Sequence, residues 1–195
     1  MEEPPAASDG PAAPATPAST GGPPASGAPA AAPSRRVLPA LVALTAVLVV
    51  SVDQATKAWA VNALADGAPI RLVDGLFQLR LFRNPGAAFS FATGTTWVFT
   101  VVATVVSVVI VRISRRLGSP GWALALGLLL GGAVGNLLDR LFRQPGFGRG
   151  HVVDFLDLPR LFVFNVADAC ITVAAVLIAL LGVRGVGVDG SRLPR

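Results

Sequence analysis

Four long apolar stretches constrain the fold of this chain more than any other feature of the sequence. They cover residues 37–52, 95–111, 122–138 and 162–183. A helix that crosses the hydrocarbon core of a bilayer needs about 20 apolar residues, with a range of about 17–25. The first stretch reaches that length if its helix continues beyond Asp53. The sequence therefore predicts an α-helical integral membrane protein with four transmembrane helices and both termini on one side.

The composition agrees with a membrane protein and argues against several other classes. Hydrophobic residues make up 53% of the chain and charged residues only 14%, whereas soluble domains carry roughly 25% charge. Cys170 is the only cysteine and His151 the only histidine, so a disulfide scaffold is excluded and no metal site is expected. The net charge of +5 could indicate a nucleic-acid-binding protein, but the arginines of the chain do not interleave with aromatic residues. We therefore expect no nucleic-acid partner. We also expect no cofactor, because the two-carboxylate chemistry considered below needs none.

Residues 1–33 differ in composition from the rest of the chain. They hold 9 of the 16 prolines and 11 alanines, without apolar periodicity, so we expect a disordered cytoplasmic extension. We expect residues 34–184 to form the membrane domain and residues 185–195 a cytoplasmic tail. Arg35 and Arg36 precede the first apolar stretch, so a cleaved twin-arginine signal is an alternative to a mature helix. The length of that stretch and the three further stretches favour the mature helix.

The distribution of arginines predicts the orientation in the membrane. Counting Lys and Arg gives eight on each side, but segment 112–116 is short, holds three arginines and lacks acidic residues. Cytoplasmic loops have this character, so we expect both termini in the cytoplasm. Residues 53–94 and 140–161 are then the outer loops. In the first outer loop, residues 76–83 partly alternate between apolar and polar, which is typical of a strand. Residues 84–86 (NPG) form a turn signal, and residues 87–91 could return as a second strand. We therefore expect a small extracytoplasmic β-structure.

Polar and charged residues occur at four places near or within the apolar stretches. Charged groups at such places are energetically costly and by default suggest function. The residues are Asp53, Lys57, Asn136, Asp139, Arg140, Asp154, Asn165 and Asp168.

Each group also has a structural interpretation. Asp53 and Lys57 are four residues apart and could form an ion pair that snorkels to the interface. Asp139 and Arg140 could form an interfacial salt bridge. Asp154 lies in the second outer loop, where a lone carboxylate is usually solvated. Asp168 is six residues into the fourth stretch, and at that depth it should face protein or water.

Two carboxylates that converge at one membrane surface could share a proton. One could then activate water while the other donates to a scissile carbonyl, as in aspartic peptidases. Two alternatives remain open. In a transporter, Asp53, Asp139 and Asp168 would line an ion path, although the charges crowd toward one face. A membrane scaffold would use residues 1–33 to recruit partners, but it gives no reason for Asp168.

Five segments of the sequence resemble the lipoprotein signal peptidases, also called signal peptidase II, a family of membrane aspartic peptidases. The resemblance covers about residues 37–184. The segments are 53–57 (DQATK), 84–90 (NPGAAFS), 131–140 (GGAVGNLLDR), 152–155 (VVDF) and 164–168 (FNVAD). Residues 141–150 look longer than in compact family members.

The resemblance implies an endopeptidase of the bacterial inner membrane that removes signal peptides from diacylglyceryl-modified prolipoproteins, cutting before the lipidated cysteine. Its partners would be that substrate and membrane lipids, and we expect a monomer with its site near the outer face. Asp154 and Asp168 would be the catalytic pair. The implied supporting residues are Asn136, Arg140 and Asn165 around the substrate backbone, Asn84 and Gly86 in the β-structure, and Asp53 and Lys57. Asp139 would orient the site or act as the second acid.

Overall fold

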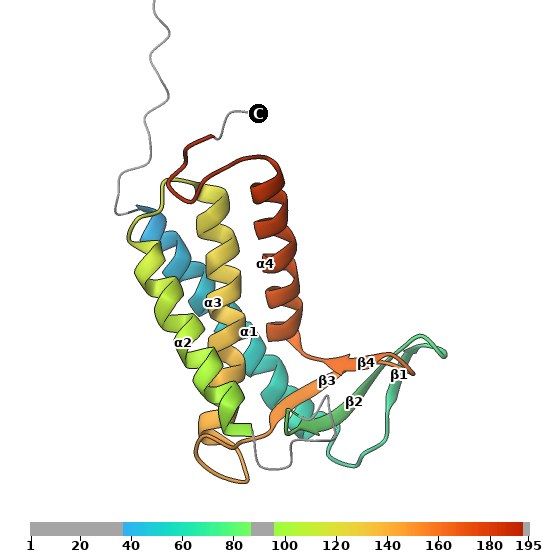
Figure 1. Ribbon diagram of the computed structural model, residues 1–195. Coiled ribbons are helices and arrows are strands. Elements are labelled where there is room, and N and C mark those ends of the chain that lie inside the picture. Colours follow the sequence, from blue (N-terminus) through green and yellow to red (C-terminus); the bar gives the residue numbers. More distant parts are fainter. Residues whose placement is uncertain (1–36, 87–95, 193–195) are drawn as a thin grey trace, which may run out of the picture. The chain divides into compact units, whose positions relative to one another are not determined.

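The structure is a computed structural model that describes residues 37–86 and 96–192 (Figure 1). Helices and strands follow one another along the chain. The elements are α1 (Val37–Ala63), β1 (Ile70–Val73), β2 (Phe77–Asn84), α2 (Thr96–Ser114), α3 (Pro120–Phe142), β3 (Val152–Leu158), β4 (Phe162–Phe164) and α4 (Val166–Val183).

All four helices are long and apolar enough to cross a membrane. This finding confirms the four predicted transmembrane helices. α1 continues beyond Asp53 to Ala63, as its short apolar stretch required. The prediction that the fourth helix begins with its apolar stretch, at residue 162, is wrong. Residues 162–164 form β4, which pairs with β3, and the helix begins only at Val166.

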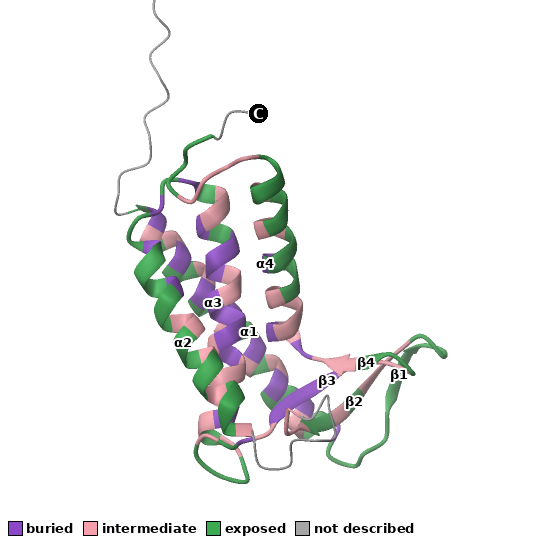
Figure 2. Ribbon diagram, in the orientation of Figure 1, coloured by how far each residue is buried: buried purple, intermediate pink, exposed green. Residues whose placement is uncertain are grey.

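α3 is the central helix of the bundle, because it packs against α1, α2 and α4 (Figure 1). Buried residues are concentrated along α3, whereas much of α2 and α4 is exposed (Figure 2). The exposed side chains of α2 and α4 are largely apolar. Such surfaces are unfavourable in water, but lipid tails solvate them without cost.

Glycines on α3 allow its neighbours to approach closely. A Cβ atom on Gly131 would lie 2.6 Å from Val49 Cβ and 3.0 Å from the backbone oxygen of Ala46, both on α1. A Cβ atom on Gly132 would lie 2.6 Å from the backbone oxygen of Ala167 on α4. Gly127, Gly131 and Gly135 recur every four residues on the surface through which α3 contacts α1, as small residues often do between membrane helices.

The strands form one antiparallel sheet in the order β1-β2-β3-β4. It lies at the end of the bundle where α1 and α3 end and α2 and α4 begin (Figure 1). The predicted strand at 76–83 is confirmed as β2. The returning strand expected at 87–91 lies outside the described residues. Within the described residues β2 pairs with β1 and with β3, so the sheet joins the two loops at this end of the bundle.

The end of the bundle opposite the sheet is closed by residues 185–192. Trp122 Nε1 donates to the backbone oxygen of Val186 at 2.9 Å, and the Gly118 N–H donates to that of Val188 at 3.0 Å. The chain after α4 therefore packs onto the connection between α2 and α3.

Replacing Gly131 by alanine should lower the melting temperature in detergent–lipid micelles. The added methyl group meets Val49 and rigid backbone of α1, and such overpacking costs about 1–3 kcal/mol. Gly182→Ala is the matched control, because nothing lies within 4 Å of its Cβ position. An unchanged melting temperature for Gly131→Ala would show that α1 and α3 do not depend on this close approach.

Candidate active site

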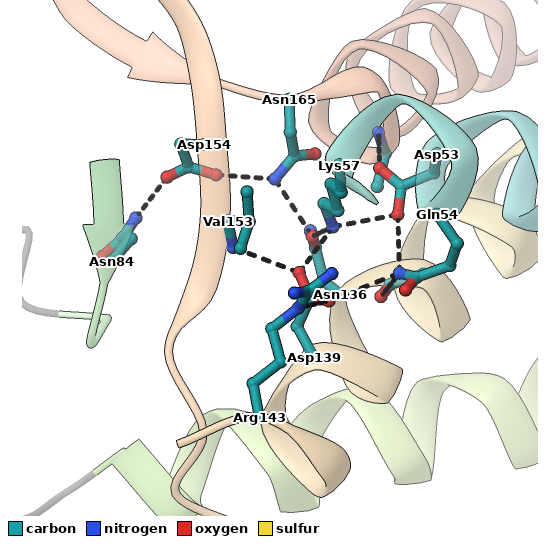
Figure 3. A network of polar contacts seen from close by, with 12 residues as sticks. Asp53, Gln54, Lys57, Asn84, Asn136, Asp139, Arg143, Val153, Asp154 and Asn165 are labelled. Atoms are coloured by element: carbon teal, nitrogen blue, oxygen red, sulfur yellow. Dashed lines mark hydrogen bonds and ion pairs between the residues drawn. The ribbon is translucent and has the colours of Figure 1, made fainter. Parts of the chain in front are cut away.

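A fully buried lysine lies at the centre of the polar network (Figure 3). Lys57 Nζ is 2.9 Å from Asp53 Oδ2, 2.9 Å from Asp139 Oδ2, and donates to Asn136 Oδ1 at 3.0 Å. An ammonium group has three protons, and these three acceptors satisfy all of them. The Asp53–Lys57 pair exists, but the snorkelling interpretation is wrong, because both side chains are 0% exposed.

The two carboxylates beside Lys57 connect it to other elements. Asp53 Oδ1 accepts a hydrogen bond from the backbone N–H of Ala167 at 3.0 Å, at the start of α4. Asp139 Oδ2 accepts from the backbone N–H of Val153 on β3 at 3.1 Å. The cluster therefore ties α1 and α3 to α4 and to the sheet.

Asp139 also forms an ion pair with Arg143, one turn further along the chain. The structural interpretation of Asp139 and Arg140 as an interfacial salt bridge is therefore wrong. Asp139 pairs instead with Lys57 and Arg143.

Two asparagine side chains connect Lys57 to the remaining carboxylates, and Figure 3 shows the branch that runs through Asn136 and Asn165 to Asp154. Because lysine can only donate, Asn136 must turn Oδ1 toward it, and its Nδ2 then donates to Asp168 Oδ1 at 2.8 Å. Asn165 Nδ2 donates to Asn136 Oδ1 at 3.2 Å and to Asp154 Oδ1 at 2.6 Å. The charge on Lys57 thus fixes the direction of both amides.

Asp168 is part of the N-terminal cap of α4. Its backbone N–H donates to Asn165 Oδ1 at 2.9 Å, and its Oδ2 accepts from the Asn165 backbone N–H at 3.3 Å. This is a capping box, a pairing that satisfies two free N–H groups at a helix start. Asp168 is six residues into the fourth apolar stretch, but the helix begins only at Val166. It is in the first turn of α4, where the helix dipole favours a negative charge.

Asp154 lies in β3 and is only 1% exposed. The expectation of a solvated loop carboxylate is therefore wrong, because pairing of β3 with β2 buries it. Burial raises the pKa of Asp154 to about 6. Hydrogen bonds from Asn84 and Asn165 oppose this rise, and the charge of Asp168 adds to it.

Asn84 holds the second oxygen of Asp154 from the end of β2. Its Nδ2 donates to Asp154 Oδ2 at 2.9 Å, and its own Oδ1 accepts from the Gly86 N–H at 2.8 Å. Gly86 has a φ of 92°, a conformation that favours glycine. This turn thus fixes the direction of the Asn84 amide.

Arg140 lies at the edge of the network and is 8% exposed. Its guanidinium carbon is 5.1 Å from the centroid of the Phe99 ring, a cation–π arrangement. Its Nη1 is buried and has no hydrogen-bond partner among the residues that the structure describes. A buried donor without a partner is unusual and calls for an explanation.

The structure thus brings eight of the residues singled out from the sequence into one connected network. Arg140 and Gly86 border that network. Sequence reasoning assigned no role to two members, Gln54 and Arg143. Gln54 Nε2 donates to Asp53 Oδ2 at 3.1 Å and to the Gly135 backbone oxygen at 3.0 Å. Arg143 was signalled by its spacing of four residues from Asp139 on a helix.

Comparison with known proteins identifies the family. The sequence profile described as "Signal peptidase (SPase) II" matches residues 45–184. The chain belongs to the signal peptidase II family. It is 52% identical over 145 residues to the lipoprotein signal peptidase of Rhodococcus jostii (strain RHA1), covering 74% of this chain and 73% of that protein. It is 46% identical over 153 residues to that of Leifsonia xyli subsp. xyli, covering 78% and 71%.

Solved structures agree with this membership. One, described as a bacterial membrane enzyme determined by the in meso method at 2.3 Å resolution, has a TM-score of 0.64 and 25% identity, covering 80% of this chain and 95% of that one. A second, described in the same way at 1.9 Å resolution, has a TM-score of 0.63 and 26% identity, covering 74% and 94%.

Replacing Lys57 by methionine should strongly destabilise this signal peptidase II. The substitution leaves the buried carboxylates of Asp53 and Asp139 without their shared cation, and breaking a buried ion pair costs about 3–5 kcal/mol. Adding Asp53→Asn to Lys57→Met should restore part of the loss, because it removes one uncompensated charge. Thermal unfolding in micelles measures both. Equal stability of wild type and Lys57→Met would show that the buried carboxylates do not depend on the Lys57 ammonium.

The peptidase should become less stable as the pH rises from about 4 to about 6. Over this range native Asp154, with a pKa of about 6, keeps a proton that the unfolded chain, with a pKa of 3.8, releases. Stability falls with pH wherever the native state binds more protons, and two pKa units correspond to at most about 3 kcal/mol. Asp154→Asn should flatten the dependence of the melting temperature on pH. The same slope in both proteins would refute the raised pKa.

Proposed function

We propose that this chain is an aspartic endopeptidase of the bacterial cell membrane that removes signal peptides from diacylglyceryl-modified prolipoproteins. In this proposal Asp154 and Asp168 are the catalytic pair. One observation carries the assignment: Asn165 hydrogen-bonds to both carboxylates, donating from Nδ2 to Asp154 Oδ1 and from its backbone N–H to Asp168 Oδ2. The relatives named lipoprotein signal peptidase support the substrate class.

Hydrolysis would need one proton shared by the two carboxylates. The ionised member takes a proton from water as the water oxygen attacks the scissile carbonyl carbon. The protonated member donates to the carbonyl oxygen. When the tetrahedral intermediate collapses, the C–N bond breaks, the carboxyl that took the proton from water gives it to the leaving amine nitrogen, and a hydroxyl of the intermediate returns a proton to the other carboxylate. The raised pKa of Asp154 supports a dyad that keeps one proton near neutral pH.

The free donor of Arg140 suits a substrate carbonyl. Nη1 lacks a partner among the described residues, and a substrate backbone oxygen would supply the missing acceptor. In this proposal Asn136 and Asn165 hold the carboxylates in place. Asn84 and Gly86 form the wall of the site on the side of the sheet, and Asp139 orients Val153 and Lys57 instead of acting as the second acid.

The lipid part of the substrate would stay in the bilayer. Moving an acyl chain out of lipid costs about 0.8 kcal/mol per methylene, so the site must open sideways to the membrane. The sheet next to the site exposes apolar side chains, among them Leu72, Leu76 and Phe162. These exposed side chains support contact of the sheet with the membrane interface and with the diacylglyceryl group.

The proposed orientation places the site near the outer face of the membrane and both termini in the cytoplasm. The arginines of segment 112–116 support it, because they lie at the end of the bundle opposite the sheet (Figure 1) and arginine-rich short loops are typically cytoplasmic. We propose that residues 34–184 act as a monomer in this arrangement.

A cleavage assay in detergent–lipid micelles tests the proposal. Wild type should cut a diacylglyceryl-modified prolipoprotein and leave its unlipidated form intact. Asp154→Asn and Asp168→Asn should each abolish cleavage, a loss of at least about 10³-fold, because each removes the acid or the base.

Asp157→Asn is the matched control. Asp157 is also a buried acid of β3, but it contacts Gln78 and Arg80 and no member of the proposed dyad. It should keep cleavage within about tenfold of wild type, a loss worth about 1.4 kcal/mol. Near-normal cleavage by a folded Asp154→Asn or Asp168→Asn protein would overturn the dyad. Cleavage of both substrate forms would overturn the lipid requirement.

A further inference from the structure

A long groove runs along the bundle between α1 and α2, with α3 as its floor. It has a volume of about 730 Å³ and is lined by residues within 43–51 of α1 and 107–115 of α2, with Leu130 and Val134 of α3. It forms because α1 and α2 each pack against α3 but barely contact one another. The volume falls within the range of about 300–1,000 Å³ that is typical of small-molecule sites. None of the residues assigned to the catalytic site lines it.

The length of the groove matches one leaflet of a bilayer. Residues 107–115 of α2 span about 12 Å at a rise of 1.5 Å per residue. Half of the hydrocarbon core of about 30 Å is about 15 Å. The lining is largely alanine, valine and leucine, so the groove suits an acyl chain that runs from one membrane surface toward the midplane.

The end of the groove at the membrane surface is basic. Arg112 and Arg115 line it, and together with Arg116 they also line an adjoining hollow of about 470 Å³. The ion pairs found among the described residues involve none of these three arginines. Basic pockets between membrane helices on the cytoplasmic side bind anionic lipid headgroups.

The charge also argues against a peptide segment as the occupant. The start of a bacterial signal peptide is positively charged, and it would meet two or three arginines at the mouth of this groove. An anionic phosphodiester with acyl chains attached fits both the mouth and the lining.

We propose that this groove binds one anionic phospholipid, with its headgroup on Arg112 and Arg115 and an acyl chain between α1 and α2. The site is separate from the catalytic network and does not depend on the proposed peptidase activity. A lipid seated there would fill the space between two helices that contact each other only slightly, and so would stabilise their packing.

Lipid binding to the full chain tests the proposal directly. Delipidated protein in detergent is titrated with phosphatidylglycerol or with phosphatidylcholine of the same acyl chains. Native mass spectrometry counts bound lipids, and thermal unfolding measures the stabilisation. Each arginine near an anionic headgroup is worth about 1 kcal/mol, or about fivefold in affinity. With two arginines at the headgroup, wild type should therefore prefer phosphatidylglycerol by about 25-fold.

Charge variants test the headgroup contact. Arg112→Gln/Arg115→Gln should lose the preference for phosphatidylglycerol. Arg184→Gln/Arg192→Gln removes the same charge from exposed residues after α4 that do not line the groove, and it should keep the preference. Equal affinity of wild type for the two lipids, or an unchanged preference in the first variant, would overturn the proposal.

Steric variants test the acyl contact. Ala43→Phe places a ring in the groove and should lower the affinity for both lipids. Leu44→Phe adds a ring on the neighbouring exposed position, which does not line the groove, and it should bind both lipids as wild type does. If Ala43→Phe leaves lipid binding intact but raises the KM for a prolipoprotein, the groove binds the substrate instead and the proposal is wrong.

Discussion

The buried ammonium of Lys57 is the interaction on which the rest of the site depends. A charge taken out of water is costly unless its partners replace the lost hydration. Here three acceptors from α1 and α3 surround it. This arrangement requires α1 and α3 to be very close, and glycine makes it possible, because a Cβ on Gly135 would lie 2.7 Å from Asp53 Oδ2. The close packing of α1 against α3 and the buried polar network therefore depend on each other.

The same ammonium determines which way the neighbouring amides point. An asparagine side chain can rotate by half a turn with little change in shape, which exchanges its donor and its acceptor. Lys57 can only donate, so it fixes the orientation of the Asn136 amide, and Asn136 in turn fixes the orientation of the Asn165 amide. Donors are thereby directed at Asp168 and Asp154 before any substrate arrives. In the proposed mechanism, dipoles fixed in advance need no reorganisation during the reaction, and such preorganisation is a major source of catalysis.

Hydropathy and turn signals were sufficient to predict the four helices and β2, because these depend on local sequence. β3 and the burial of Asp154 were missed, because they arise from pairing with β2, which lies about 70 residues earlier in the chain. β4 was taken for helix because an apolar run has no period that separates a short strand from a helix. The spacing of Asn165 and Asp168 could have corrected this, since a side-chain acceptor at the cap and an acid three residues later mark a helix start.

The pairing of Asp139 follows from the spacing of four residues on α3. Gly127, Gly131 and Gly135 face Thr45, Val49 and Asp53 of α1. Residues four apart share a helix face, so the next member of this row is Asp139, and it meets Lys57.

Gly132 begins the adjacent row, which faces α4 through Ala167 and Ile171. The next members of that row are Asn136, which meets Asp168, and Arg140, whose Nη1 has no partner among the described residues. The two rows of α3 therefore have different roles. The row toward α1 ends in the charges that hold the bundle together. The row toward α4 ends in the groups that we assign to the substrate and the catalytic pair.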